Sequence, residues 1–388
     1  MRTTYVPPFT AETAKELQRK TSAPVAGDTS APSQRGNPLL IGLDLGTNTS
    51  RLFAAWPGSP DLVADEVLPT LVGYAREGIV ENLLPGNAKT LYGQLAAKNR
   101  LYLRMVAPLA NGVIADMAAA QDFIRYLRQT INAPVGTELH AVVGLPARAD
   151  RAAHDGLAHA LTGFFDRVML VPEPFLAALG FRDEARLSDP AYLDPVSNSI
   201  FVDIGAGTTD VCLVQGYFPT GDDQVSAAFA GDKVDEVLHA AIRHEHPDVE
   251  LSRVKVRELK EQHSYVGRLE TPIVVSVLVG GKPRKLDLSA VVGDACQQLL
   301  VRVFDCVTSV IAQASSDSVA AALQNIILTG GGSRTRNLDT ELQRLLVEDG
   351  YEAPRVLTVG ERYKDHVARG ALAAARQAKE SQWLPLPV

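Results

Sequence analysis

The sequence predicts an α/β protein made of two similar halves. In each half an apolar strand ends in an Asp, a short loop of Gly and Thr follows, and a second apolar strand begins at once. This pattern occurs at Asp44 and again at Asp203. Further apolar β-branched strands and amphipathic helical patterns follow each copy. A recurrence at such a long interval indicates two related half-proteins and not a short-period solenoid.

Each half is also predicted to carry a small inserted subdomain, because mixed segments interrupt the regular patterns. Residues 1–37 are rich in Pro, Ser, Thr, Gly and Ala, which predicts a disordered tail, with a short helical pattern over residues 11–20. The predicted segments are a tail at 1–37, a first half at 38–180 with its insertion at about 61–107, a surface connection at 181–198, a second half at 198–376 with its insertion at about 231–290, and a C-terminal tail at 377–388.

Composition limits the class of protein. The chain has 388 residues, 21% charged and 46% apolar, a balance typical of a soluble globular protein with two ordinary domains. A net charge of −7 without a dense Lys/Arg stripe argues against nucleic acid as the main partner. No apolar run reaches the ~18 residues of a membrane span, and no secretory signal is visible. We therefore expect a cytoplasmic protein without direct membrane insertion, whose three cysteines are buried thiols, Cys212, Cys296 and Cys306.

Both Asp-containing loops have the composition of a phosphate-binding turn. Their glycines remove Cβ atoms so that backbone N–H groups can close on an oxygen-rich ligand, and Thr hydroxyls add donors. An Asp beside such a cradle is useful mainly when Mg²⁺ lies between them. One Asp-x-Gly turn is common for structural reasons alone, but a plain turn has no need to repeat Asp, Gly and Thr in the same order. The candidate phosphate ligands are Gly46, Thr47, Asn48, Gly205, Gly207, Thr208 and Thr209.

Glu173 lies where a predicted strand meets a predicted helix, directly before Pro174. One interpretation is an ordinary acidic residue at a helix N-terminus, where negative charge is favoured. The other is a carboxylate held rigidly at the rim of a cleft, able to orient or deprotonate a water molecule. The local sequence leaves both interpretations open.

Two further segments carry candidate residues. A helical pattern over residues 254–264 contains Lys260, which is either a solvated charge or a ligand contact. A predicted strand over residues 326–329 runs into three consecutive glycines, Gly330, Gly331 and Gly332. Such a run lets the backbone pass flat against a phosphate or a ligand face, although a strand-to-helix turn can need glycines for geometry alone.

Together these loops predict a nucleoside triphosphate site between the two halves. No Gly-x-x-x-x-Gly-Lys-Ser/Thr motif occurs and the loops lead into strands, which excludes a Walker P-loop and a dinucleotide Rossmann site. The arrangement resembles the actin, Hsp70 and sugar-kinase superfamily, and within it the bacterial actins of the MreB and MamK branch. This resemblance implies an actin-like fold, in which two RNase H-like halves enclose a nucleotide cleft.

The resemblance extends over about residues 39–376 and does not include the N-terminal tail. Within the branch it is greatest to the MamK group, the actin-like filament proteins of magnetosomes, through KEQHSYVG at 260–267 and LQNI at 323–326. The segments that resemble the whole branch are PLANGVIAD at 108–116, GLPARA at 144–149, EPF at 173–175, DIGAGTTD at 203–210 and GGGSR at 330–334.

The resemblance implies roles for individual residues. Asp44 and Asp203 would act on Mg²⁺, largely through water, and on the reacting water. Glu173 would position the attacking water, Lys260 would belong to a nucleotide-contacting helix, and residues 330–332 would pass beside the adenosine. It also implies ATP/ADP as ligands, self-association into filaments, ATP hydrolysis that drives filament turnover, and an organelle or adaptor protein as a partner. We infer that closure of the halves on assembly brings Glu173 into line.

Other members of the superfamily provide alternatives. Residues 44–52, DLGTNTSRL, resemble the first loop of exopolyphosphatases, but the second loop reads AGTTD at 206–210 and not the Gly-Gly-Ser-Thr-Glu of those enzymes. An Hsp70-like chaperone would need a peptide-binding domain after residue 376, where few residues remain. A sugar kinase would need a catalytic Asp aimed at a bound hydroxyl, and no such motif is found. An actin-like filament ATPase is therefore the predicted function.

Overall fold

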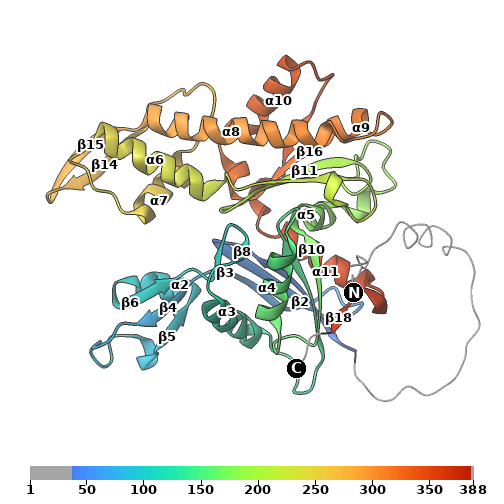
Figure 1. Ribbon diagram of the computed structural model, residues 1–388, viewed down its shortest axis with the longest axis horizontal. Coiled ribbons are helices and arrows are strands. Elements are labelled where there is room, and N and C mark those ends of the chain that lie inside the picture. Colours follow the sequence, from blue (N-terminus) through green and yellow to red (C-terminus); the bar gives the residue numbers. More distant parts are fainter. Residues whose placement is uncertain (1–36, 386–388) are drawn as a thin grey trace, which may run out of the picture.

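The computed structural model describes residues 37–385. The predicted N-terminal tail with its helical pattern over residues 11–20 lies outside the described residues, apart from residue 37. The described chain forms two α/β lobes (Figure 1), the first built mainly from the N-terminal half and the second from the C-terminal half. The structure therefore confirms the prediction of two halves.

The first lobe is built on a six-stranded sheet in the order β18-β10-β9-β1-β2-β3. β1 pairs antiparallel with β2, as the predicted hairpin requires, and parallel with β9. Helices α3 (Met117–Thr130) and α4 (Arg151–Leu161) pack on one face of this sheet. Its strands are β1 (Leu39–Leu45), β2 (Thr49–Ala55), β3 (Leu62–Pro69), β9 (Leu139–Leu145), β10 (Arg167–Pro172) and β18 (Leu384–Pro385).

The second lobe repeats this plan in a five-stranded sheet, β13-β12-β11-β16-β17. β11 pairs antiparallel with β12 and parallel with β16, just as β1 does with β2 and β9. Helices α8 (Ser289–Ile311) and α10 (Leu338–Glu348) cover one face, and the short α9 (Val319–Leu323) precedes β16. Its strands are β11 (Ser199–Ile204), β12 (Thr209–Val214), β13 (Gln224–Ala227), β16 (Ile326–Thr329) and β17 (Val356–Thr358).

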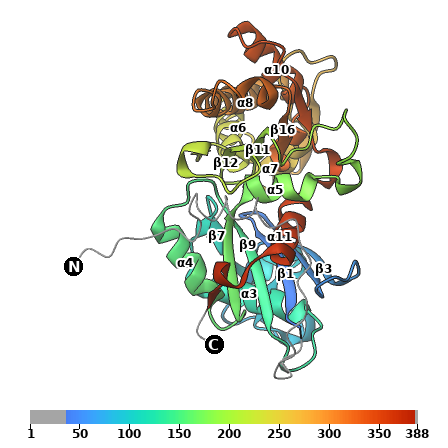
Figure 2. The ribbon, with the colours of Figure 1, turned by 90° about the vertical axis from the view of Figure 1, so that its right-hand side faces the viewer.

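A third hydrophobic layer joins the lobes, because alternate residues of each central strand face opposite ways. In β11, Ile200 and Val202 point into the core of the second lobe, whereas Phe201 points into the layer between the sheets. That layer is formed by α5 (Glu173–Phe181) and α11 (His366–Gln377), which lie where the lobes meet (Figure 2). Strands buried on both faces explain the continuous apolar runs in the sequence.

Helices α5 and α11 cross with their backbones in contact. A Cβ atom on Gly370 would lie 1.7 Å from the carbonyl oxygen of Leu176, and one on Gly180 would lie 1.9 Å from that of His366. Any side chain at either position would force the helices apart. The two glycines therefore set the distance between the helices that join the lobes.

Gly370→Ala is expected to destabilise the protein by about 2 kcal/mol or more, since its methyl group would collide with rigid backbone. Gly156→Ala in α4 is the matched control: its Cβ would meet no atom within 4 Å. The higher helix propensity of Ala should make that variant about 0.5–1 kcal/mol more stable. Urea unfolding of both variants measures the difference. Equal stability of the two variants would contradict this account of the crossing.

The first insertion is a three-stranded sheet with its own small core of Leu84, Leu91, Ala96 and Leu103. It consists of β4 (Val72–Ala75), β5 (Thr90–Tyr92), α2 (Gly93–Lys98) and β6 (Leu103–Val106). The predicted start at residue 61 is wrong, because β3 pairs with β2 in the main sheet. As the outer strand, β3 has only Ala64 fully buried, so it lacks the apolar run of a central strand.

The second insertion contains α6 (Gly231–Glu245), α7 (Arg253–His263) and the hairpin β14 (Val274–Val279) to β15 (Lys282–Asp287). Both insertions lie on the same side of the molecule (Figure 1). The hairpin turns through Gly280 and Gly281, whose positive φ angles of 56° and 79° suit a two-residue turn. Helix α6 begins at Gly231, so the Gly and Asp that resemble a turn in the sequence form its first turn.

The predicted C-terminal tail is in part a docked segment. After α11, β18 pairs antiparallel with β10, and Trp383 is buried against the ring of His140. Burial of this indole and the open edge of β10 explain the docking. All three cysteines are buried and free, as predicted. Among residues 37–385, no helix has both the length and the apolar character needed to span a membrane.

Candidate functional site

A cavity of about 370 Å³ lies between the lobes. Its lining includes the β1–β2 loop (residues 46–48, loop 1), the β11–β12 loop (residues 205–208, loop 2) and the starts of α5 and α6. The structure thus brings the two repeated loops to opposite sides of one cleft. The predicted site residues that line it are Asp44, Gly46, Thr47, Asn48, Glu173, Asp203, Gly205, Gly207, Thr208, Lys260, Gly330, Gly331 and Gly332.

Thr209 is the exception. Its side chain is fully buried in β12, and its Oγ1 donates a hydrogen bond to the carbonyl oxygen of Phe229 at 2.8 Å. The prediction of Thr209 as a phosphate ligand is therefore wrong. Successive side chains of a strand point to opposite faces, so Thr208 lines the cavity while Thr209 is directed into the lobe.

Loop 1 is held by contacts within its own lobe. Thr70 Oγ1 donates to the carbonyl oxygen of Gly46 at 2.6 Å. Thr47 Oγ1 accepts a hydrogen bond from the backbone N–H of Gly112 at 3.0 Å. Gly112 and Asn111 form the turn between β7 (Leu109–Ala110) and β8 (Val113–Ile114), both with positive φ. Loop 1 is therefore fixed in place by a second turn at the cleft.

Loop 2 touches this same turn from the other lobe. A Cβ atom on Gly207 would lie 2.5 Å from Asn111 Cα and 3.0 Å from Thr47 Oγ1. Glycine is thus required here for the lobes to approach each other. Asn111 was not predicted as a site residue, although its segment, 108–116, resembles the bacterial actins.

Two of the three consecutive glycines are needed for packing. A Cβ on Gly330, which has φ +76°, would lie 2.4 Å from Asp203 Oδ1, and one on Gly332 would lie 2.1 Å from Ile204 Cγ2. At Gly331 the nearest atom is 3.9 Å away, in the ring of Tyr363. Both interpretations of the motif therefore apply: it packs on β11 and it lines the cavity.

Three carboxyls, of Asp44, Glu173 and Asp203, line the cleft at what we call its floor, and a fourth, of Asp210, lies near them. Burial raises the pKa of Asp44 to about 7. Burial and the nearby Asp44 and Asp210 raise the pKa of Asp203 to about 8. The pKa of Glu173 is raised well above its usual range by burial and by these three aspartates. The floor is therefore a place where added negative charge is unfavourable and a cation is favoured.

Asp210 links the floor to the first lobe. Burial raises its pKa to about 6, although hydrogen bonds from Ser226, Thr208 and Ala147 partly oppose the shift. The backbone N–H of Ala147, two residues after the end of β9, donates to Asp210 Oδ1 at 3.1 Å. This contact joins the two lobes. Nothing in the sequence around Asp210 predicted it.

The floor suits a magnesium ion most of whose ligands are water molecules and phosphate oxygens and not protein side chains. Within the described part of the chain, no three His, Cys, Asp or Glu side chains are close enough together to hold a metal ion by themselves. Mg²⁺ usually keeps several waters and binds one or two carboxylates together with phosphate oxygens. Asp44 and Asp203 would fit that use, since a divalent charge would stabilise both carboxylates.

Glu173 is the first residue of α5, and its side chain lines the cavity. No side chain caps this helix, whose N-cap residue is Pro172. The side chain lies tightly against β9: a Cβ on Gly144 would be 2.8 Å from Glu173 Cγ and 3.1 Å from Val367 Cγ1. Glu173 thus combines the favoured charge at a helix N-terminus with a position in the cleft.

Gly144→Ala is expected to displace Glu173, because the new methyl group and Glu173 Cγ cannot occupy their present positions together. Overpacking of a buried strand should cost about 1–3 kcal/mol of stability. If the protein hydrolyses ATP, that activity should fall more than nucleotide binding does. Urea unfolding and phosphate release measure the two effects. Unchanged hydrolysis would indicate that the position of Glu173 is unimportant.

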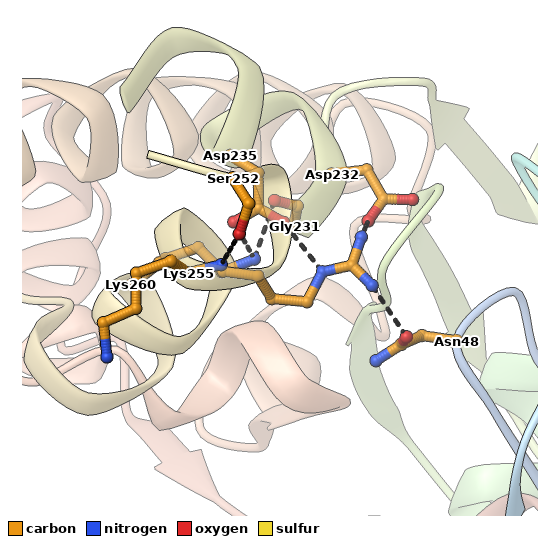
Figure 3. A network of polar contacts seen from close by, with 8 residues as sticks. Asn48, Gly231, Asp232, Asp235, Ser252, Lys255 and Lys260 are labelled. Atoms are coloured by element: carbon orange, nitrogen blue, oxygen red, sulfur yellow. Dashed lines mark hydrogen bonds and ion pairs between the residues drawn. The ribbon is translucent and has the colours of Figure 1, made fainter. Parts of the chain in front are cut away.

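Lys260 is not a solvated surface charge. Its Nζ lies 2.9 Å from Asp235 Oδ1 and donates to the carbonyl oxygen of Gly231 at 2.8 Å (Figure 3). Arg257, one turn earlier on α7, also lines the cavity. The sequence prediction missed Arg257 and Asp232. Arg257 lies three residues before Lys260, and Asp232 lies three residues before Asp235. Residues at this spacing share a helix face, and this was the signal available in the sequence.

Other residues of the cavity lining are not acidic. Leu299 and Cys296 of α8 form an apolar part of the lining, and Ser264 and Thr335 supply hydroxyl groups. An apolar surface with a few polar groups suits a ring system better than a phosphate chain. The lining thus combines loops suited to phosphates with apolar and hydroxyl groups suited to a nucleoside.

Comparisons with known proteins place this arrangement in a family. The family model described as MreB/Mbl protein matches residues 39–382. Actin-like protein MamK of Paramagnetospirillum magneticum is 31% identical over 358 residues, covering 91% of this chain and 96% of the relative. A solved MamK double helical filament has a TM-score of 0.79 at 30% identity, over 88% of this chain and 100% of its own. A non-polymerising MamK mutant bound to AMPPNP has a TM-score of 0.63 at 29% identity, over 87% and 99%. The chain has the actin-like fold and belongs to the MreB/Mbl family of bacterial actin-like proteins.

Proposed function

We propose that this protein is an actin-like ATPase that binds Mg-ATP in the cleft, assembles into filaments and hydrolyses ATP to drive filament turnover. The observation that carries the proposal is the cleft itself, in which two phosphate-loop hairpins of like sequence face each other beside the partly buried Asp44 and the buried Asp203. The MamK relative solved with AMPPNP supports a nucleotide in this cavity.

The loops and the glycine motif would divide the nucleotide between them. Backbone N–H groups of loops 1 and 2, with the hydroxyls of Thr47 and Thr208, would hold phosphate oxygens. Lys260 would add positive charge, and residues 330–332 would pass beside the adenosine. Mg²⁺, when bound with the nucleotide, would neutralise charge on the phosphates.

Hydrolysis would depend on Glu173 as the residue that holds the attacking water. Burial and the neighbouring aspartates raise the pKa of Glu173 and so favour its neutral form, whereas a divalent cation at the floor would favour the carboxylate that can accept a proton. Phosphoryl transfer needs positioning and charge stabilisation more than covalent help from the protein. Closure of the lobes about the crossing of α5 and α11 on assembly would bring Glu173 into line.

Filament formation and cellular role are inferred from the relatives. The MamK filament supports self-association. We infer a cytoplasmic cytoskeletal filament that organises magnetosomes or a similar organelle, with an organelle or adaptor protein as its partner. An exopolyphosphatase-type phosphohydrolase is not favoured, because the matched family is MreB/Mbl and the second loop has Asp210 where that enzyme class has Glu.

Sedimentation and electron microscopy with Mg-ATP test the proposal. We expect the protein to pellet and to form filaments above a critical concentration with Mg-ATP, and to release phosphate. A protein that stays monomeric over all concentrations and salt conditions would contradict the filament. Phosphate release from polyphosphate in the absence of nucleotide would favour the alternative enzyme.

A further inference from the structure

Arg257 of α7 joins three polar side chains around one guanidinium at the rim of the cleft. Its Nη1 donates to Asn48 Oδ1 at 2.9 Å, its Nη2 to Asp232 Oδ1 at 2.9 Å and its Nε to Asp235 Oδ2 at 3.0 Å. Figure 3 shows Asn48 approaching this network from the opposite side to Asp232 and Asp235. Asn48 belongs to loop 1 in the first lobe, whereas the other three residues belong to the second insertion. The contact with Asn48 therefore crosses the cleft.

The same network reaches loop 2 through the backbone. The N–H of Asp232 donates to the carbonyl oxygen of Ala206 at 2.7 Å, and the N–H of Gly231 donates to that of Gly205 at 3.1 Å. The first N–H groups of α6 thus bind loop 2. Since Asp232 also holds Arg257, an unbroken chain of hydrogen bonds runs from loop 1 through Arg257 to loop 2. We call Asn48, Arg257 and Asp232 the loop bridge.

The guanidinium is held in place for this contact. Asp235 is only 9% exposed, and its two oxygens bind Arg257 and Lys260 separately. Together with Asp232 it fixes two nitrogens of the planar group, which leaves Nη1 directed at Asn48. Such a fixed fork loses little conformational entropy when it makes its third hydrogen bond. The geometry therefore suits a role for Arg257 in positioning loop 1, beyond neutralising the charges of Asp232 and Asp235.

We propose that Arg257 is a positioning residue that ties the two phosphate loops together and so sets how long a nucleotide stays in the closed cleft. The inference rests on the proposed nucleotide-binding function. A nucleotide clamped between loops 1 and 2 can leave only when the loops separate, and separation breaks the bond between Arg257 and Asn48. The Arg257 side chain is 39% exposed, so water can replace this bond and the expected effect is moderate.

Two substitutions separate loop bridging from simple support of α6 and α7. Arg257→Ala removes every contact of the guanidinium. Arg257→Lys keeps a positive charge for Asp232 or Asp235, but an ammonium group has no planar fork with which to reach Asn48 as well. If the loop bridge controls nucleotide release, both variants should release the nucleotide faster than the wild type and at similar rates. If Arg257 only neutralises the two aspartates, Arg257→Lys should behave like the wild type.

Release of a fluorescent ATP analogue from the full-length protein, chased with excess ATP at a concentration below assembly, measures the effect. We expect about fivefold faster release from both Arg257 variants, the scale of one charged hydrogen bond weakened by solvent. Lys255→Ala is the matched control: it removes a cation from the same helix, whose ion pair with Glu258 lies on the surface. Its release rate should equal that of the wild type.

Hydrogen exchange of the nucleotide-free protein supplies a second readout. Backbone amides of loop 1 should exchange faster in both Arg257 variants than in the wild type or in Lys255→Ala. Wild-type release from Arg257→Lys, or unchanged exchange in loop 1, would overturn the inference. Failure of the wild type to bind the analogue would contradict the proposed function instead, and the exchange of loop 1 would still decide whether the bridge exists.

Discussion

Glu173→Gln is expected to slow phosphate release from Mg-ATP by about 100-fold or more, the usual contribution of a positioned general base. The amide keeps the shape of the side chain and its place against Gly144 but cannot take a proton from water. Binding of ATP should be unchanged or tighter, because the amide cannot add a negative charge to a crowded carboxyl cluster. Filaments should still form with Mg-ATP and should persist longer. Single-turnover phosphate release and light scattering measure the two behaviours.

Glu184→Gln is the matched control for this prediction. Glu184 is exposed and lies beyond the C-terminal end of α5, outside the cavity lining. Its loss should leave phosphate release at the wild-type rate. If Glu173→Gln hydrolyses ATP as fast as this control, Glu173 serves only as a favourable charge at the start of α5.

Asp203→Asn is expected to stabilise the nucleotide-free protein and to weaken its binding of Mg-ATP. The pKa of Asp203 is about 8 in the folded protein against 3.8 ordinarily, so the folded state binds more protons than the unfolded state between these values. Stability contributed by the protonated carboxyl is complete below pH 3.8 and is lost as pH rises through about 8. The neutral amide avoids this loss, and the variant should gain on the order of 1–3 kcal/mol at pH 8.

Urea unfolding at pH 5, 6, 7 and 8 tests this prediction without nucleotide. The wild type should lose stability across this range more steeply than Asp203→Asn. Asp61→Asn, at an exposed carboxylate outside the cavity lining, should follow the wild-type curve. With Mg-ATP the order should reverse, since only the wild type retains the carboxylate for Mg²⁺. A variant that is less stable than the wild type at pH 8 without nucleotide would contradict the effect of burial.

The sequence predicted the architecture well because its signals are local. A strand, an Asp, a Gly-containing loop and a second strand identify a hairpin within about 16 residues, and two copies identify two halves. The hairpins at Asp44 and Asp203 and the strand before Gly330 lie where the sequence predicts them. The ends of elements depend on contacts between distant segments: α6 begins at Gly231 because loop 2 accepts its first N–H groups.

Side-chain direction within the site was harder to predict. Thr208 and Thr209 are chemically alike and adjacent, and only the pairing of β12 with β11 and β13 decides which of them reaches the cavity. In the same way, Trp383 is buried only because the edge of β10 is open to β18. Such choices depend on neighbours supplied by other parts of the chain.

The hairpins at Asp44 and Asp203 thus followed from the sequence itself, and so did the prediction that two phosphate loops with an acidic residue each face one cleft. The tertiary structure decided how the loops are joined. Arg257 and Asn48 are 209 residues apart, and no recognisable sequence motif contains both of them. Their bond exists because α6 and α7 place the guanidinium at the rim of the cleft while α5 and α11 set the distance between the lobes. A local pattern can specify a loop, but the packing of whole helices determines what that loop meets.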